Sequence, residues 1–558
     1  MSDDLRGPLP VVLLWHMHQP HYRDALSGEY VLPWTYLHGL KDYSDMAAHL
    51  EANAAARAVI NVTPVLFEQL HDYTRMLGLY LQRGQPINDR VLALLTEAPL
   101  PGSVADRTAI VEACLRAQRQ RMIERFSAYS ALADIPATEI TDPELRDLAV
   151  WYHLAWCGEA LRRDNAVIHR LIAQQRDFSV SDRRALLTVI ADTLAGIVPR
   201  WRRLAEAGRI ELSVTPYAHP ILPLLQDFGS AREAQPDASL PDAAGYPGGD
   251  ERAAWHVDEA LRRFVAVFGF RPRGCWPAEG AISRRTLELL ESRGFEWAAS
   301  GGSVLQNSLD ASHSGLGDAA LNQPWRLRDA RLKCFFRSDH LSDLVGFQYS
   351  RWHGDHAAAD LGNQLTELAD RYQGESGRCV LVALDGENAW EHYPDNGWWF
   401  LNSLYRELTQ NPKLRLTTLS EAGQLATAPA VLTRIVAGSW VHGTLATWMG
   451  DADKNRAWEL LCAAKRSYDE VRASGRLTSS GLAAATQQLA QCESSDWFWW
   501  FGDYNPADAV ASFEQLFRRQ LTALYHLLGT EAPADLGRPL SQGGGTAEGG
   551  GSMRRANA

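Results

Sequence analysis

The chain has 558 residues, of which 46% are hydrophobic and 22% charged, a composition typical of globular proteins that excludes a disordered or fibrous one. The net charge of −12, without a long basic run, argues against nucleic acid or an anionic membrane as a partner. No apolar run reaches the length of about 18 residues that a bilayer-spanning helix needs.

Cysteine usage and the N-terminus indicate a cellular compartment. The seven cysteines are scattered, odd in number and without a CxxC pair, which is typical of a reducing environment without disulfides. The first residues lack a basic region before their short apolar stretch, so we expect a strand there rather than a secretory signal. The sequence therefore predicts a cytoplasmic protein, and it assigns no oligomeric state.

Short apolar runs alternate with helical segments along the chain. The runs are VVLLWHMHQP (11–20), IELSVTPYAHP (210–220), GCWPAEG (274–280), FEWAAS (295–300) and CVLVALDGENAW (379–390). Continuous apolar runs between helices predict a parallel sheet that is buried on both faces, and hence an α/β protein. A barrel and an open doubly wound sheet both place functional residues at the carboxyl ends of such strands.

The remaining segments predict helices and a tail. We expect a catalytic region at 1–430 with a mostly helical insertion at about 40–185, and an α-helical C-terminal domain at 431–535. The Gly-rich stretch 536–558 is expected to be disordered.

Histidines gather at the end of the first run. His16 and His18 alternate along a strand, so their side chains point to one face. That spacing suits metal ligands and also suits donors to substrate hydroxyl groups. Because no third ligand stands in an obvious motif, we predict no metal and no cofactor. His219 lies in another strand-end segment, between two prolines.

Two carboxylates end other runs. Glu279 stands on a turn between Pro277 and Gly280, which suits a positioned nucleophile. Asp385 ends a buried strand, where a partly desolvated carboxyl suits a general acid, with Glu387 and Glu391 as further candidates. Either acid alone could be a helix cap or a turn residue. Paired carboxylates at one sheet edge are typical of glycosidic bond cleavage.

Five segments carry a resemblance to a known family. WHMHQP, IELSVTPYAHPILPLL, GCWPAEGAIS, VLVALDGENAWEHY and SWVHGTLATWMGDADKNRAWELL resemble, in that order, the five motifs of glycoside hydrolase family 57, over about residues 10–530. The family contains α-amylases, amylopullulanases, 4-α-glucanotransferases and glucan branching enzymes. The resemblance implies an incomplete (β/α)7 barrel with a helical C-terminal domain, α-glucan substrates and a retaining mechanism. Glu279 would be the nucleophile and Asp385 the general acid/base.

The resemblance also implies residues that bind the α-glucan. By motif match these are His18, His219, Trp276 and Trp390, and we expect His16, Gln19, Asp339, His340 and Glu387 to bind substrate as well. Two Trp-rich stretches, 439–451 and 496–508, keep no helical period and are predicted as loops of a cleft wall to which Trp440, Trp448 and Asp451 contribute. Alternatively, these Trp only join the domains.

More than one subtype and more than one reaction class fit the sequence. Three segments look more like those of amylases and amylopullulanases than those of branching enzymes: HQP in the first motif, WPAEG and FFRSDHLSDLVGFQYS (335–350). This likeness favours cleavage of α-1,4 linkages, with α-1,6 linkages as a further candidate. A 4-α-glucanotransferase would use the same double displacement. A metal-dependent sugar deacetylase or mannosidase using His16, His18 and an acid, and a non-catalytic glucan-binding protein, are the alternatives from other classes.

Overall fold

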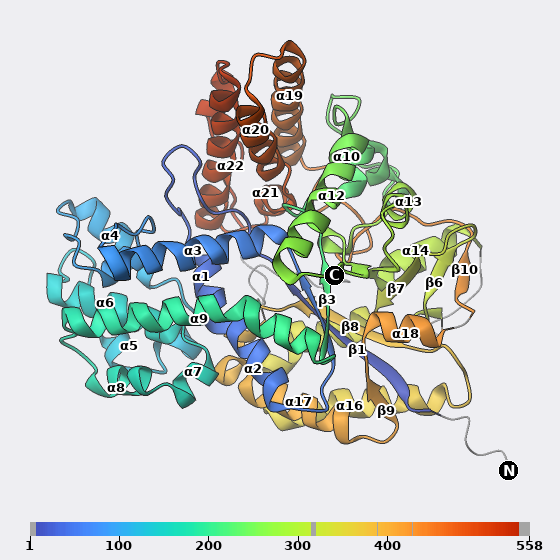
Figure 1. The fold of residues 1–558 in the computed structure, drawn as a ribbon, viewed down its shortest axis with the longest axis horizontal. Coiled ribbons are helices and arrows are strands. Elements are labelled where there is room, and N and C mark those ends of the chain that lie inside the picture. The colour runs from blue at the N-terminus through green and yellow to red at the C-terminus, as the bar shows by residue number, and fades with distance from the viewer. Residues whose placement is uncertain (1–6, 314–319, 388, 427, 546–558) are drawn as a thin grey trace.

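A mostly parallel sheet forms the centre of the molecule (Figure 1). The computed structural model describes residues 7–313, 320–387, 389–426 and 428–545. The strands are β1 Leu9–Met17, β2 Ala58–Val62, β3 Ile210–Val214, β4 Gly274–Cys275, β5 Trp297–Gly301, β6 Trp325–Leu327, β7 Lys333–Arg337, β8 Val380–Asp385, β9 Leu414–Leu416 and β10 Ala430–Leu432. The five predicted strands are therefore confirmed as β1, β3, β4, β5 and β8.

Seven strands make an incomplete (β/α)7 barrel, which confirms the predicted fold class. Their order is β7-β5-β4-β3-β2-β1-β8, and each pairs in parallel with its neighbour. Strands β6 and β10 extend the β7 edge, and β9 pairs with β1. The two ends approach without a continuous ladder: the backbone N–H of Ser338, just after β7, donates to the carbonyl of Leu381 at 2.8 Å.

Helices surround the sheet and bury both of its faces. Between β1 and β3 lie α1 Trp34–His38, a π-helix η1 Gly39–Tyr43, α2 Ser44–Ala52, α3 Pro64–Arg83, α4 Val104–Cys114, α5 Ser127–Ala133, α6 Asp142–Ala155, α7 Glu159–Asp164, α8 Ala166–Gln174 and α9 Val180–Glu206. Then follow α10 Leu222–Gln226, α11 Ala231–Ala234, α12 Gly249–Phe268, α13 Arg284–Ser292, α14 Gly302–Ala311, α15 Asp339–Asp343, α16 Gly354–Arg371, α17 Trp398–Gln410 and α18 Leu419–Leu425.

The region predicted as a mostly helical insertion also contributes a central strand. Figure 1 shows α3 to α9 gathered on one side of the sheet, as expected. Within that region, however, Ala58–Val62 forms β2 between β1 and β3. The segment AVINV is only five residues long and fully buried, so its short apolar run was not distinguishable from a helix by periodicity.

The C-terminal part is helical, with two departures from expectation. Helices α19 Ala452–Ser474, α20 Ser479–Cys492 and α22 Ala507–Leu528 stand side by side (Figure 1), as their amphipathic pattern predicts. The stretch 496–508 is not a loop throughout, because Ser495–Trp500 forms α21. The predicted division into domains at about 430 stays a prediction.

Part of the stretch predicted as a disordered tail packs against the helical part. Residues 534–537 form a 3-10 turn, and Leu540 and Ser541 are buried against the helical part, where Leu540 N–H donates to Glu514 at 2.7 Å. Residues 546–558 lie outside the described residues. Among the described residues, no helix combines the length and apolar character that crossing a bilayer requires.

Candidate active site

A cleft of about 360 Å³ opens at the carboxyl ends of the parallel strands. Parallel register places His16 of β1 beside Asp385 of β8 on one side and Asn61 of β2 on the other. The strand ends therefore bring together residues that are far apart in the sequence. Of the predicted site residues, the cleft is lined by His16, His18, Gln19, His219, Glu279, Asp385, Glu387, Glu391 and Trp440.

Glu279 is held in an unusual backbone conformation. It lies in the turn after β4 with φ 59° and ψ 21°, in the left-handed region that costs a non-glycine residue roughly 1–3 kcal/mol. Its carboxylate Oε2 accepts a hydrogen bond from the Trp440 indole at 2.9 Å, and its carbonyl accepts from the Trp440 backbone N–H at 3.0 Å. The turn thus aims a carboxylate into the cleft, and Trp440 fixes it there.

A chain of hydrogen bonds sets the tautomers of two imidazoles. His16 Nδ1 lies 2.6 Å from Asn61 Oδ1, which only accepts, so Nδ1 carries the proton and Nε2 accepts. The His16 Nε2 therefore accepts from His219 Nε2 at 3.0 Å, and His219 Nδ1 accepts from the Ser495 hydroxyl at 2.8 Å. Burial lowers the pKa of both imidazoles, which keeps them neutral at pH 7.

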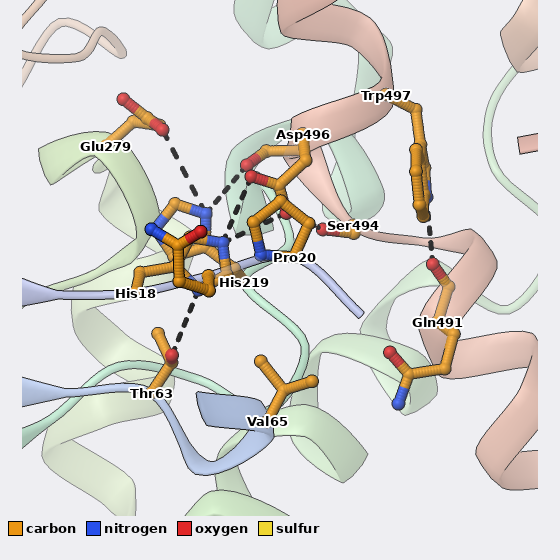
Figure 2. A network of polar contacts seen from close by, with 12 residues as sticks. His18, Pro20, Thr63, Val65, His219, Glu279, Gln491, Ser494, Asp496 and Trp497 are labelled. Carbon is orange, nitrogen blue, oxygen red and sulfur yellow. Dashed lines mark hydrogen bonds and ion pairs between the residues drawn. The ribbon is translucent and has the colours of Figure 1, made fainter. Parts of the chain in front are cut away.

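His18 connects the barrel to the C-terminal helices. Its Nε2 lies 3.0 Å from both carboxylate oxygens of Asp496 at the start of α21, and its Nδ1 lies 2.9 Å from the Thr63 hydroxyl (Figure 2). Burial lowers the pKa of His18 well below its ordinary value and raises that of Asp496. A neutral His18 that donates from Nε2 to an Asp496 carboxylate satisfies both groups.

The same cluster contains a set of donors that could hold a metal ion. The ligand atoms of His18, His219 and Asp496 lie within 4.8 Å of one another. The two imidazole rings are stacked, however, with centroids 3.8 Å apart and planes inclined by 12°. Ring-nitrogen lone pairs lie in the ring planes, and lone pairs in two stacked, nearly parallel planes do not meet at one point. The arrangement in Figure 2 is therefore suited to a hydrogen-bonded network better than to a zinc site.

Comparison with known proteins decides the family. The family model of glycosyl hydrolase family 57 matches residues 12–434, about three quarters of the chain. The chain belongs to glycosyl hydrolase family 57. The family predicted from the five motifs is therefore confirmed, and with it the prediction that this protein is an enzyme.

Solved structures of family 57 enzymes share the fold. The branching enzyme from Pyrococcus horikoshii is similar with a TM-score of 0.57 at 15% identity, over 95% of this chain and 96% of that one. The α-amylase AmyC from Thermotoga maritima gives 0.55 at 12% identity, over 95% of each chain. The 4-α-glucanotransferase from Thermococcus litoralis gives 0.52 at 11% identity, over 93% of this chain and 60% of that one.

Two predicted aromatic residues of this family 57 chain lie behind the cleft rather than in it. Trp276 is fully buried and packs edge-on against Trp440 with centroids 5.1 Å apart. Trp390 is also buried, donates to the carbonyl of Gly386 at 2.8 Å and packs against Trp15. Both predictions of direct substrate contact are therefore corrected: these rings support cleft residues from beneath.

Asp339 and His340 also fall outside the cleft lining. Asp339 is buried, pairs with the guanidinium of Arg337 at 2.9 Å and accepts from Ser303 at the start of α14. Arg337 lines the cleft, so Asp339 positions a lining residue. His340 is exposed and bonds Gln364 at 2.9 Å.

The predicted wall is only partly as expected. Trp440 lines the cleft, but Trp448 is fully buried and packs against Trp499, with ring centroids 6.0 Å apart. Asp451 accepts from the backbone N–H of Asp453 at 2.8 Å and caps α19. Neither Trp448, which is enclosed, nor Asp451, which caps a helix, lines the cleft.

Sequence reasoning did not identify the polar partners of the three histidines, among them Asn61 and Asp496. Asn61 is the only polar residue of the run AVINV, a signal that a buried strand carries a functional or hydrogen-bonded group. Asp496 stands in the Trp-rich stretch assigned to the cleft wall, but nothing in its neighbours pointed to His18.

Proposed function

We propose that this protein is a retaining glycosidase that acts on α-glucans such as glycogen, starch or maltodextrin. One observation carries the proposal: Glu279 and Asp385, from the ends of β4 and β8, face one cleft. The family 57 relatives with this fold act on α-glucans. The imidazoles of His16, His18 and His219 line the same cleft beside this pair.

Glu279 and Asp385 take opposite roles in the double displacement. The Glu279 carboxylate attacks the anomeric carbon while Asp385 gives its proton to the leaving oxygen, so the glycosidic bond breaks and a glycosyl ester forms on Glu279. Asp385 then takes a proton from water, whose oxygen attacks the same carbon and releases Glu279. The left-handed backbone conformation of Glu279 and its hydrogen bond to Trp440 keep the carboxylate directed into the cleft during both steps.

Transfer to a sugar acceptor is the second candidate, by the same two steps. If an acceptor hydroxyl replaces water, the protein is a 4-α-glucanotransferase. The fold neighbours include both a hydrolase and transferases, which supports keeping both outcomes. The sequence features favour the amylase and amylopullulanase side. We place the activity in the cytoplasm, which the seven buried, unpaired cysteines support.

Product analysis tests the proposal. Incubation with maltoheptaose, pullulan and glycogen, with products resolved by chain length, separates hydrolysis from transfer: products longer than maltoheptaose show transfer, and maltotriose from pullulan shows α-1,6 cleavage. NMR of the first product should show the α-anomer, because two successive displacements at the anomeric carbon retain its configuration. Release of the β-anomer would contradict the double displacement.

The nucleophile is tested by one substitution. Glu279→Gln should lower turnover by several orders of magnitude and leave glucan binding largely intact, because the amide keeps the shape and loses the nucleophilic oxygen. A Glu279→Gln variant that kept half of the activity would remove Glu279 from this role.

A further inference from the structure

Arg337 crosses the gap between the two ends of the barrel. Strands β7 and β8 stand at the ends of the row of seven parallel strands, and Arg337 is the last residue of β7. Its Nη1 donates to the carbonyl of Ala383 in β8 at 3.0 Å. Ala383 lies two residues before Asp385 on the same strand. One side chain therefore connects the end of β7 to the strand that carries the proposed acid/base.

The guanidinium of Arg337 is held in one orientation by two acids. Its Nε donates to Oδ1 of Asp339 at 2.9 Å, and its Nη2 lies 3.6 Å from Oδ1 of Asp343. Asp339 is fixed in turn, because its Oδ2 accepts from the backbone N–H and the hydroxyl of Ser303 at 2.9 and 2.8 Å. A Cβ at Gly302 would lie 2.8 Å from the carbonyl of Arg337, so this close approach depends on the glycine. Contacts with β8 and α15 thus set the plane of the guanidinium.

The face of this guanidinium covers the indole of Trp440. The Arg337 Cζ lies 4.8 Å from the ring centroid, and the two residues are only 4% and 8% exposed. The attraction between a cation and an aromatic face is stronger where water is excluded. The same indole donates to Oε2 of Glu279 at 2.9 Å. A displacement of the guanidinium would therefore free the ring and, with it, the carboxylate of Glu279.

We propose that Arg337 is a positioning residue that fixes the two proposed catalytic carboxylates relative to each other. It acts on Glu279 through the Trp440 indole and on Asp385 through the backbone of β8. The inference rests on the proposed function, because a double displacement needs both carboxylates at a set separation beside the glycosidic bond. Since Arg337 acts through protein groups, its loss should lower kcat and leave KM unchanged.

Removal of the guanidinium tests this role. In Arg337→Met, kcat on maltoheptaose should fall by about ten- to a hundredfold while KM stays within about twofold of wild type. Arg378→Met is the matched control, because Arg378 also stacks on an aromatic ring, that of Tyr372 at 4.6 Å, and pairs with Glu375 at 2.8 Å. Arg378 precedes β8, at the end of the strand opposite Asp385. Equal kcat in the two variants, or a raised KM with unchanged kcat as expected for direct sugar contact, would overturn the inference.

Arg337→Lys keeps the buried positive charge and takes the place of the Met variant if that variant does not fold. A single Nζ cannot contact Asp339 and Ala383 and also cover an indole face, so kcat should still fall by about tenfold. When this change is combined with Trp440→Phe, the double variant should keep at least about threefold more kcat than the product of the two single effects. Effects that simply multiply would overturn the route through Trp440.

A measurement without substrate separates this inference from the proposed function. With isotope-labelled indole nitrogens, the NMR signal of the Trp440 indole N–H is assigned by its absence in Trp440→Phe. Its exchange with deuterium should be at least about threefold faster in Arg337→Lys than in wild type or Arg378→Lys, because the bond to Glu279 opens more often. Unchanged exchange would overturn the inference. If the wild type acted on no glucan while the exchange responded to Arg337→Lys, the proposed function would fail and the positioning would stand.

Discussion

The indole of Trp440 donates to Oε2 of Glu279 at 2.9 Å, across 161 residues of sequence. The backbone of Trp440 makes a second bond, to the carbonyl of Glu279, at 3.0 Å. The approach is possible because β5 ends in Gly301, where a Cβ would lie 2.7 Å from the Trp440 Cα. Trp440 therefore fixes both the backbone and the carboxylate of the proposed nucleophile.

Removing the indole N–H should impair turnover. In Trp440→Phe the Glu279 carboxylate loses a hydrogen bond that is worth about 1.5–3 kcal/mol to a charged group, so kcat should fall by about ten- to a hundredfold with a small change in melting temperature. Trp399→Phe is the matched control, because the exposed Trp399 indole also donates to a carboxylate, Asp395, at 2.7 Å. If Trp440→Phe and Trp399→Phe had the same kcat, the role of Trp440 in fixing Glu279 would be contradicted.

Trp448 should matter for stability and not for substrate. The side chain is fully buried, and the Trp448 carbonyl accepts from the Trp458 indole at 3.0 Å. Trp448→Ala should lower the free energy of unfolding by about 3–5 kcal/mol, because it leaves a large cavity, while KM for long glucans stays unchanged. A raised KM with an unchanged melting temperature would return Trp448 to the cleft wall.

A buried ion pair anchors the segment between α20 and Asp496. Glu493 follows α20, three residues before Asp496, and bonds Arg252 at 2.6 Å, His256 at 2.7 Å and Tyr246 at 2.6 Å. Burial alone would raise the pKa of Glu493, but Arg252 and His256 outweigh it and lower the pKa to about 2. Because the folded pKa lies below the ordinary value, the contribution to stability is present above about pH 4.5 and is lost as the pH falls toward 2.

Glu493→Gln should therefore destabilise the protein at neutral pH by about 3–5 kcal/mol, since it leaves Arg252 buried without its partner. The difference from wild type, measured by urea unfolding, should shrink as the pH is lowered toward 2. Glu251→Gln is the control: its ion pair with Arg472 joins α12 to α19, but both side chains are about half exposed, so the loss should stay within about 1 kcal/mol. If the difference in free energy of unfolding between Glu493→Gln and wild type did not change with pH, the lowered pKa of Glu493 would be contradicted.

Chelation should leave the activity intact. The rings of His18 and His219 are stacked and His18 already bonds Asp496, so the cluster meets its hydrogen-bonding needs internally. We expect full glucan activity after prolonged dialysis against EDTA, with the metal content followed by elemental analysis. Loss of activity that zinc alone restores would favour the metal-dependent deacetylase or mannosidase class.

The sequence alone indicated the main strands and the proposed catalytic acids. Runs such as VLVALD are local signals, because a strand buried on both faces needs continuous apolar residues, and functional groups follow at its carboxyl end. His16, Glu279 and Asp385 could therefore be placed at one sheet edge without knowledge of the strand order. The short strand β2 was not predicted, because a run of five residues is too short to show a strand or helix period.

Contacts between distant segments were decided only by the tertiary structure. His18 meets Asp496 across 478 residues, and Trp440 meets Glu279 across 161, and neither partner carries a local mark of the other. The same holds for burial: Trp440 and Trp448 stand in one Trp-rich stretch, yet the first lines the cleft and the second is enclosed. Local sequence determines which residues end a strand, whereas the packing of the C-terminal helices against the barrel determines which side chains the cleft exposes.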